Sequence, residues 1–342
     1  MKICICGGGN LGHVTAGMLS LDKRNNVSVF TRKPELWSNK LSMKHPDGST
    51  TESVLGNVTN VPSEVIPQAD IVIICLPGFA IPSELQTIKP FLEKNTIVGA
   101  IVSSTGFFFE AHKILPSSTP LFGFQRVPYI SRIIEYGKAA EVKGLKPSLR
   151  MAVENIPDKD IFVKKIEGLF NMPVELMDSY YEVSLSNSNP LLHPARLYSM
   201  WKDWHPGIEY DEIPGFYEDW NDDASELYIK MDDELQSLLN KLHIRKGAII
   251  PVLEYYESHD VASLTNKISH IPAFKGIKAP MIKTDSGKYI PDFSSRYFTE
   301  DFPFGMKYIL QAASTQEDID SLKELSTITK VYQWGISKIK SL

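Results

Sequence analysis

Cysteine is scarce in this chain of 342 residues, and its three cysteines form no metal-binding pattern. Cys4 and Cys6 alternate along one apolar run, Cys75 ends another, and no Cys-x-x-Cys or Cys/His cluster occurs. Structural zinc sites and small disulfide scaffolds need such clusters. We therefore expect no metal site and three buried, chemically quiet thiols.

The chain also lacks a long apolar run and an excess of basic charge. No apolar stretch reaches the length of a membrane span, and the N-terminus has the pattern of a core strand rather than a signal peptide. The 36 basic and 41 acidic residues give a net charge of −5, which argues against nucleic-acid and membrane partners. With 43% hydrophobic residues, the sequence predicts a cytoplasmic globular protein of two domains.

What the chain does contain is a glycine motif within its first twelve residues. An apolar strand pattern leads into Gly7-x-Gly9-x-x-Gly12, and an apolar helical pattern follows. Gly7 allows a tight turn, Gly9 lets a pyrophosphate approach the backbone, and Gly12 lets helix and strand pack closely. The first turn of the helix then binds phosphate through its free N–H groups, so Asn10 and Leu11 are also predicted cofactor contacts.

The end of the second predicted strand, 27–31, bears on the choice of cofactor. An NAD enzyme places an acidic residue about twenty positions beyond the glycine turn, on the ribose 2′-hydroxyl. Here the strand ends in Thr31, Arg32 and Lys33, with no acid. A guanidinium and an ammonium suit a 2′-phosphate, so NADP(H) is favoured over NAD(H). The alternative is that both are solvated surface charges.

Buried strand patterns alternate with helical ones through the first half of the chain. They predict an α/β Rossmann-type, doubly wound parallel sheet with helices on both faces. Ligands bind beyond the carboxyl ends of such strands. Leu76, Pro77 and Ser104 occupy those positions and are predicted to line the path of the nicotinamide, although ordinary turn chemistry explains them equally well.

Near residue 178 the pattern changes to long amphipathic segments, such as 222–242. We therefore predict a dinucleotide-binding domain over residues 1–177 and a helical domain over 178–342. The stretch 276–291, rich in Pro, Gly and Lys, is expected to be an irregular crossing segment.

Several residues in this sequence could take part in chemistry. His193 and His205 each precede a proline, which disfavours helix and predicts a position at an element boundary. His13 begins the cofactor helix and could touch the pyrophosphate or be a spectator. Arg132 could bind a substrate carboxylate or be a plain surface charge.

Arg296 and Asp301 lie among aromatic residues in a segment too apolar to be a solvated charge run. A carboxylate there could orient an imidazole, and the arginine could hold a substrate carboxylate through two parallel hydrogen bonds. The alternative is an internal Arg–acid bridge that fixes the C-terminal segment.

Two motifs, Asn189-Pro-x-x-His193-Pro and Arg296-Tyr-Phe-Thr-Glu-Asp301, resemble the signature segments of the octopine/nopaline (opine) dehydrogenases. The resemblance implies a Rossmann domain followed by a helical domain of the 6-phosphogluconate dehydrogenase C-terminal type. It implies that an NAD(P)H-dependent enzyme condenses a 2-oxo acid with an amino group and reduces the imine. His193 would be the acid/base and Asp301 its orienting partner. Arg296 would bind a substrate carboxylate, with Asn189 also at the substrate.

An aromatic cluster and two alternative functions complete these expectations. The cluster could be a substrate pocket or ordinary core: Trp201, Trp204, Phe216, Tyr217 and Trp220. A reductase resembling ketopantoate reductase would use a lysine, for which Lys202 and Lys267 are available, whereas a hydroxyacyl-CoA dehydrogenase type would use His and a carboxylate. A non-catalytic NADP(H)-binding sensor is the alternative of another class. The expected partners are small molecules, and a homodimer through the helical domain remains open.

Overall fold

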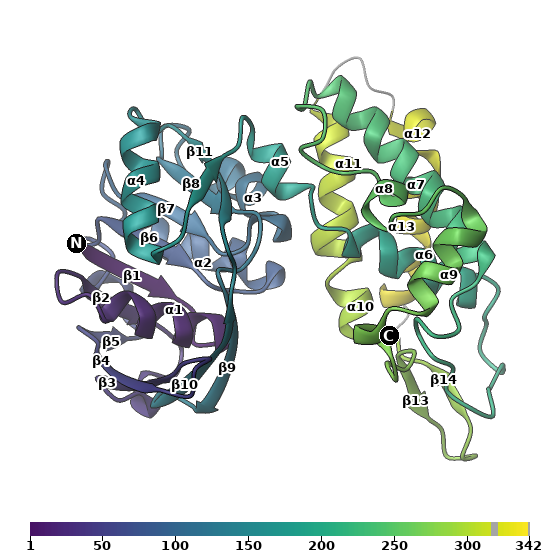
Figure 1. Cartoon of the computed structure of the whole chain (residues 1–342), viewed down its shortest axis with the longest axis horizontal. Helices are drawn as coiled ribbons and strands as arrows, with labels where there is room; N and C mark the ends of the chain where they lie inside the picture. Colours follow the sequence, from purple (N-terminus) through teal and green to yellow (C-terminus); the bar gives the residue numbers. More distant parts are fainter. Residues whose placement is uncertain (316–320, 341–342) are drawn as a thin grey trace. The chain divides into compact units, whose positions relative to one another are not determined.

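The computed structural model describes residues 1–315 and 321–340. Its contacts divide the chain into two compact units, Met1–Ser184 and Leu185–Leu342 (Figure 1). Helix α5 (Tyr180–Ser184) belongs to the first unit because Tyr180 packs against Phe108 and Phe109. The assignment of residues 178–342 to a substrate domain remains a proposal about function.

The first unit is built on an eight-stranded sheet in the order β12-β11-β8-β7-β6-β1-β2-β5. Neighbouring strands are parallel except for β11, which runs antiparallel to β8. Every residue of Ile71–Ile74 is buried, as expected for a strand covered on both faces. The predicted α/β sheet is confirmed. Its strands are β1 (Lys2–Cys6), β2 (Asn26–Phe30), β5 (Val58–Thr59), β6 (Ile71–Ile74), β7 (Ile97–Ala100), β8 (Leu121–Phe124), β11 (Leu149–Glu154) and β12 (Val174–Leu176).

The strand order of this sheet reverses direction between the neighbouring strands β1 and β6. From β1 the chain moves to β2 on one side, whereas β6, β7 and β8 follow one another on the other side. Right-handed crossovers then put the helices on opposite faces, and such a switch point is where open α/β sheets bind ligands. The helices are α1 (Asn10–Ser20), α2 (Ile81–Ile88), α3 (Phe107–Ile114) and α4 (Lys159–Phe170).

A second, four-stranded sheet covers α1, and the sequence analysis did not predict it. Its order is β4-β3-β10-β9, and all four strands contact α1. Gly17 makes the close approach possible, because a Cβ atom there would overlap the side chain of Met43. The strands are β3 (Lys40–Lys44), β4 (Thr50–Val54), β9 (Tyr129–Glu135) and β10 (Ala139–Leu145).

The second unit is mainly helical, as predicted, with a short hairpin in the stretch expected to be irregular. Within α7 the buried residues Ala224, Tyr228, Met231, Leu235 and Leu238 recur at helical spacing, and the helix packs against α6, α9 and α13. The helices are α6 (Asn189–Trp201), α7 (Asp222–Lys241), α8 (Val252–Tyr255), α9 (Val261–Ser269), α10 (Arg296–Thr299), α11 (Lys307–Ser314), α12 (Ser321–Glu324), α13 (Ser326–Lys340) and the π-helical η7 (Phe302–Met306). The hairpin strands are β13 (Met281–Lys283) and β14 (Tyr289–Pro291).

Short 3₁₀ helices connect several of these elements. They are η1 (Pro34–Leu36), η2 (Pro62–Glu64), η3 (Gly78–Ala80), η4 (Lys89–Phe91), η5 (Ser103–Thr105) and η6 (Pro272–Phe274).

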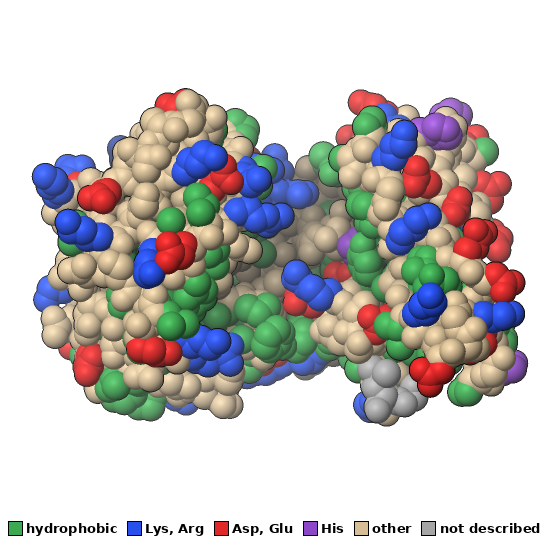
Figure 2. All heavy atoms as spheres, turned by 90° about the horizontal axis from the view of Figure 1, so that it is seen from below, with side chains coloured by type: hydrophobic (Ala, Val, Ile, Leu, Met, Phe, Trp, Pro, Cys, Tyr) green, Lys and Arg blue, Asp and Glu red, His purple; other side chains and the backbone are tan. Residues whose placement is uncertain are grey.

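Charge is unevenly distributed between the two units. Asp and Glu outnumber Lys and Arg in the second unit, and Figure 2 shows acidic side chains spread over the surface of its helices. Among the residues that the structure describes, no helix has the length and apolar character needed to cross a membrane.

Candidate functional site

The glycine turn between β1 and α1 has the geometry that a dinucleotide requires. Gly7 has φ of +123°, and a Cβ there would lie 2.6 Å from the carbonyl oxygen of Cys75. A Cβ on Gly12 would overlap the Gly7 carbonyl, whereas one on Gly9 would meet nothing within 4 Å. Gly9 therefore faces open space. No side chain caps this end of α1, a helix described in full, so its first N–H groups are available to phosphate oxygens.

His13 hydrogen-bonds to the backbone of this turn, and because its side chain is buried it does not face a phosphate. Its side chain is fully buried, its Nδ1–H donates to the Gly9 carbonyl at 3.0 Å, and its Nε2 accepts from the Gly137 N–H at 2.7 Å. The ring also stacks on Trp37 at 4.0 Å. Burial lowers the pKa of His13, which is partly offset by the Gly9 hydrogen bond, so the neutral ring ties the turn to the second sheet.

The other predicted cofactor residues of α1 and β2 lie at the same edge. Asn10 is tied to the second sheet, because its Oδ1 accepts from the Ile133 N–H at 2.8 Å. Leu11 is half-buried. Thr31 is buried beside Gly8, whereas Arg32 and Lys33 are exposed.

The predicted residues on the neighbouring strands are less accessible. Leu76 packs against Gly7, and Pro77 is half-buried. Ser104, in η5, is 6% exposed.

Sequence reasoning missed one acidic residue at this edge. Burial raises the pKa of Glu84, in the first turn of α2, to about 6, and the Cys6 thiol and the Arg32 charge oppose that rise. An acidic side chain therefore approaches Arg32 from a different element than the one where NAD enzymes normally carry it. Its position one turn into an amphipathic helix gave no signal in the sequence.

In the second unit, His193 and Asp301 form a pair. Nδ1 of His193 lies 2.7 Å from Oδ2 of Asp301, and their side chains are only 10% and 14% exposed. On the other side of the ring, Nε2 lies 2.8 Å from the Tyr217 hydroxyl. The Tyr297 ring packs edge-on against the imidazole at 4.6 Å. The structure thus joins residues that are 108 positions apart in the sequence.

His193 does not lie at an element boundary, so that part of the prediction is wrong. It is the fifth residue of α6, and Pro194 lies inside the same helix. A proline there removes one backbone hydrogen bond, to the carbonyl of Pro190. All of residues 190–197 are buried, and this packing outweighs the missing bond. His205, the other histidine before a proline, is exposed, and its Nδ1 lies 3.1 Å from the neighbouring Pro206 carbonyl.

Close packing brings Asp301 to His193. Asp301 precedes the π-helical turn η7, whose Gly305 lies against Pro190 of α6: a Cβ there would be 2.6 Å from the proline ring. Phe302 lies against Gly335 of α13, where a Cβ would overlap its ring. Both glycines let helices approach closely enough to fix the carboxylate beside the imidazole.

Arg196 is a buried cation that organises the loop carrying Tyr217. Its Nε–H donates to the Phe216 carbonyl at 2.9 Å, and its Nη2 lies 3.4 Å from the Gly215 carbonyl. Burial lowers its pKa to about 10, against the effect of Asp219, so it stays charged at neutral pH. An arginine three residues after His193 in a buried helix was a signal that the sequence analysis did not use.

The aromatic cluster is largely core. Trp201, Phe216 and Trp220 are at most 4% exposed, and Trp204 is half-buried. Of this group, Tyr217 alone is recorded with a hydrogen bond to the His193 ring.

The predicted substrate residues are exposed. The Arg296 side chain is 86% exposed and pairs with Glu300 at 3.3 Å, which matches the Arg–acid bridge left open above. Asn189 is exposed at the start of α6. Arg132, on β9 of the first unit, is exposed and contacts the Ser131 carbonyl.

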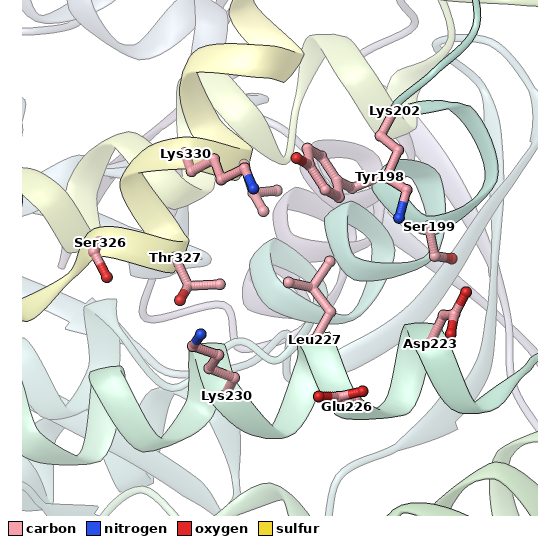
Figure 3. Close-up of a pocket in the computed structure, with 11 residues that line it drawn as sticks. Tyr198, Ser199, Lys202, Asp223, Glu226, Leu227, Lys230, Ser326, Thr327 and Lys330 are labelled. Carbon is pink, nitrogen blue, oxygen red and sulfur yellow. The ribbon is translucent and has the colours of Figure 1, made fainter.

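A groove of about 410 Å³ lies between α6, α7 and α13, away from this pair (Figure 3). Three lysines line it: Lys202, which directly follows α6, Lys230 of α7 and Lys330 of α13. Lys202 follows His193 by about two and a half helical turns, which places it on the opposite side of α6. Lys267 pairs with a glutamate at 2.6 Å. In the described part of the chain, the hydrogen-bond partners of the His193 ring are Asp301 and Tyr217, and neither candidate lysine of a ketopantoate reductase type is among them.

Comparison with known families covers both units. Residues 176–334 match the NAD/NADP octopine/nopaline dehydrogenase, alpha-helical domain family. Residues 3–123 match the ketopantoate reductase PanE/ApbA family.

Similar proteins and structures agree with these matches. Tauropine dehydrogenase of Arabella iricolor is 31% identical over 89% of this chain and 84% of its own length. Opine dehydrogenase of Haliotis discus hannai is 27% identical over 90% of this chain and 83% of its own. A structure of octopine dehydrogenase with NADH and L-arginine has a TM-score of 0.83 at 25% identity, covering 99% of this chain and 90% of that one. The chain therefore belongs to the octopine/nopaline dehydrogenase family, NAD(P)-dependent oxidoreductases that act on CH–NH groups.

Proposed function

We propose that this chain condenses a 2-oxo acid with the amino group of an amino acid or amine and reduces the resulting imine with NADPH. The observation that carries the proposal is the contact of 2.7 Å between His193 Nδ1 and Asp301 Oδ2. Histidine changes its charge near neutral pH, so it can accept and return a proton under the conditions of the reaction. The helical second unit, which the sequence analysis began at residue 178 and the contacts begin at Leu185, would then be the substrate domain.

His193 has a task in each half of the condensation. The substrate ammonium first loses a proton, which His193 accepts, and the free amine attacks the oxo carbon. The attacking nitrogen passes one of its remaining protons to the former carbonyl oxygen, and His193 then returns its own proton to that hydroxyl group, which leaves as water and gives the protonated imine. In every step Asp301 accepts a hydrogen bond from the Nδ1–H group of His193. This hydrogen bond fixes the tautomer of the neutral ring and stabilises the imidazolium.

Arg296 is proposed to bind the carboxylate of the oxo acid. Its present pair with Glu300 joins an exposed guanidinium to a carboxylate four residues later, and ion pairs that reach into water stabilise little. The guanidinium can therefore exchange the glutamate for a substrate carboxylate, which it would hold through two parallel hydrogen bonds. Asn189 and Arg132, both exposed, are proposed as further polar contacts for the substrates.

The first domain supplies a site that fits a dinucleotide. Open space at Gly9 and the uncapped start of α1 suit the pyrophosphate. The exposed Arg32 and Lys33 support a preference for the 2′-phosphate of NADPH, with Thr31 beside them. Leu76, Pro77 and Ser104 are proposed to border the nicotinamide half. The nicotinamide, when bound, supplies the hydride that reduces the carbon–nitrogen double bond.

The relatives indicate what kinds of substrate to try first. Solved structures of octopine dehydrogenase are described with L-arginine, with agmatine and with pyruvate. Another relative is named a tauropine dehydrogenase. Both cofactors also occur, because octopine dehydrogenase is described with NADH and a yersinopine dehydrogenase with NADP⁺.

The deciding experiment follows oxidation of NADPH and of NADH over a matrix of oxo acids crossed with amino acids and amines. Each component is also run alone. A signal that needs both partners would establish reductive condensation, and the best pair would name the substrates. A signal with the oxo acid alone would indicate a simple ketone reductase, and no signal with any pair would favour a cofactor-binding sensor.

A further inference from the structure

Both nitrogens of the His193 ring already have protein partners. Asp301 can only accept a hydrogen bond, so the ring carries its proton on Nδ1. The neutral ring then has a lone pair on Nε2, and the Tyr217 hydroxyl, 2.8 Å away, donates to it. An acid/base histidine must exchange protons through a free nitrogen, and in this arrangement Nε2 reaches other groups through Tyr217.

Tyr217 is held firmly in this position. Its ring stacks on Phe274 at 4.1 Å and lies parallel to Trp220, and the residue is 4% exposed. The Phe216 carbonyl just before it accepts a hydrogen bond from the buried Arg196. Because packing and backbone both fix this residue, its hydroxyl is a permanent part of the site rather than a side chain that swings away.

Burial, helped by nearby acidic groups, keeps the Tyr217 hydroxyl protonated. Burial raises the pKa of Tyr217, and Tyr297, Tyr256 and Asp301 raise it further; Tyr297 is also a side-chain hydrogen-bond partner of the Tyr217 hydroxyl. The adjacent Tyr297 also has a raised pKa, again mainly through burial and then through Asp301. A protonated phenol can donate one hydrogen bond and accept another at the same time, which is what a proton relay needs.

We propose that Tyr217 carries the proton between Nε2 of His193 and the reacting groups of the substrates. The inference rests on the proposed function. In the first half of the condensation the substrate ammonium gives a proton to the Tyr217 oxygen, while the phenolic proton moves to Nε2. In the second half Nε2–H returns its proton to that oxygen, and the phenol protonates the hydroxyl that leaves as water. Tyr217 and His193 end as they began, and no other reactant is consumed in the transfer.

The relay is tested with Tyr217→Phe, using the best substrate pair from the activity matrix. We expect kcat to fall by about 10²-fold with little change in KM, because a positioned acid/base group contributes at least this much. Tyr198→Phe is the matched control, since this half-buried tyrosine lies on α6 and lines the groove of Figure 3. It should leave kcat unchanged.

A second measurement separates a relay from a structural role. In mixtures of H₂O and D₂O, a wild-type enzyme that moves two protons together gives a curved dependence of kcat on deuterium content. Tyr217→Phe should give a straight line. If Tyr217→Phe fails to fold, Tyr217→3-fluorotyrosine keeps the ring packing while making the phenol more acidic, and it should change kcat and the pH profile.

The outcomes distinguish the relay from the proposed function. If His193→Ala is inactive while Tyr217→Phe keeps kcat within about threefold of wild type, the relay is refuted and the dyad stands. A fall in kcat with unchanged curvature also refutes it, because the hydroxyl then only positions the imidazole. If His193→Ala stays active, or if no substrate pair is turned over, the proposed function itself fails and the relay fails with it.

Discussion

Replacing Asp301 by asparagine tests the central contact of the proposed site. Asp301→Asn keeps the size of the side chain and removes its negative charge, which lies 2.7 Å from Nδ1 of His193. The two side chains are only 10% and 14% exposed, so water screens this charge poorly and cannot replace it. The variant therefore leaves the imidazolium without its counter-charge at the step where His193 holds the substrate proton.

The size of the effect follows from the role of the pair. Loss of acid/base function costs about 10²- to 10⁴-fold in rate, and a 10³-fold loss corresponds to about 4 kcal/mol in the barrier. KM for the amine and the oxo acid should change far less than kcat, because the lost interaction acts mainly in the transition state. Affinity for NADPH should not change.

Steady-state kinetics with the best substrate pair, NADPH titration and thermal unfolding together make the assay. Asp285→Asn is the control, because it removes the same charge from an exposed residue in the loop between β13 and β14. If Asp301→Asn retains kcat within about threefold of wild type and folds normally, the contact with His193 is structural and the proposed acid/base pair is wrong.

Three further predictions concern the first domain. Arg32→Ala should weaken NADPH binding about tenfold or more and leave NADH nearly unchanged, and equal losses for both cofactors would rule out a 2′-phosphate contact. Glu84→Gln should raise affinity for NADPH relative to NADH severalfold, because a carboxylate with a pKa of about 6 is mostly ionised at pH ~7 and repels a phosphate near Arg32; an unchanged preference in cofactor titrations would place Glu84 outside the site. Burial holds the pKa of His13 in the folded protein below the unfolded histidine value of about 6.5. As the pH falls below that value, the unfolded chain binds a proton that the folded chain does not, so the fold loses stability until the pH reaches the folded pKa. Wild type should thus lose more Tm than His13→Gln between pH ~8 and pH ~5, and parallel curves would contradict the buried neutral ring.

Local chemistry made the core of the first domain legible in the sequence. Gly7 and Gly12 each have a steric requirement that no other residue meets, and the four consecutive apolar residues at 71–74 are typical of a covered strand or a buried helix. The second sheet was missed because its strands are half polar. One face of it packs on α1 and the other meets solvent, so strands such as Lys40–Lys44 resemble charged loops.

The site in the second domain shows where reading a single sequence stops. A proline after His193 predicted an element boundary, but the packing of α6 overrode that local preference. The resemblance to opine dehydrogenases supplied His193 and Asp301 as a pair, whereas their contact depends on Gly305 and Pro190, which are far apart in the chain. No spacing rule connects such positions, since the tertiary fold alone brings them together.

The energetics of this cluster explain why such a site is recognisable once the fold is known. His193, Asp301 and Tyr217, with Arg196 close by, place ionisable groups inside an aromatic core, where burial of each polar group costs free energy unless it is hydrogen-bonded. Apolar residues of similar volume often pack with equal or greater stability than buried ionisable groups. Each of these groups nevertheless has a partner at hydrogen-bonding distance. Asp301 and Tyr217 contact the two nitrogens of the His193 ring, and Arg196 holds the backbone next to Tyr217. A polar network that costs stability and converges on a single titratable ring is what acid/base chemistry requires, and packing alone gives no reason for it.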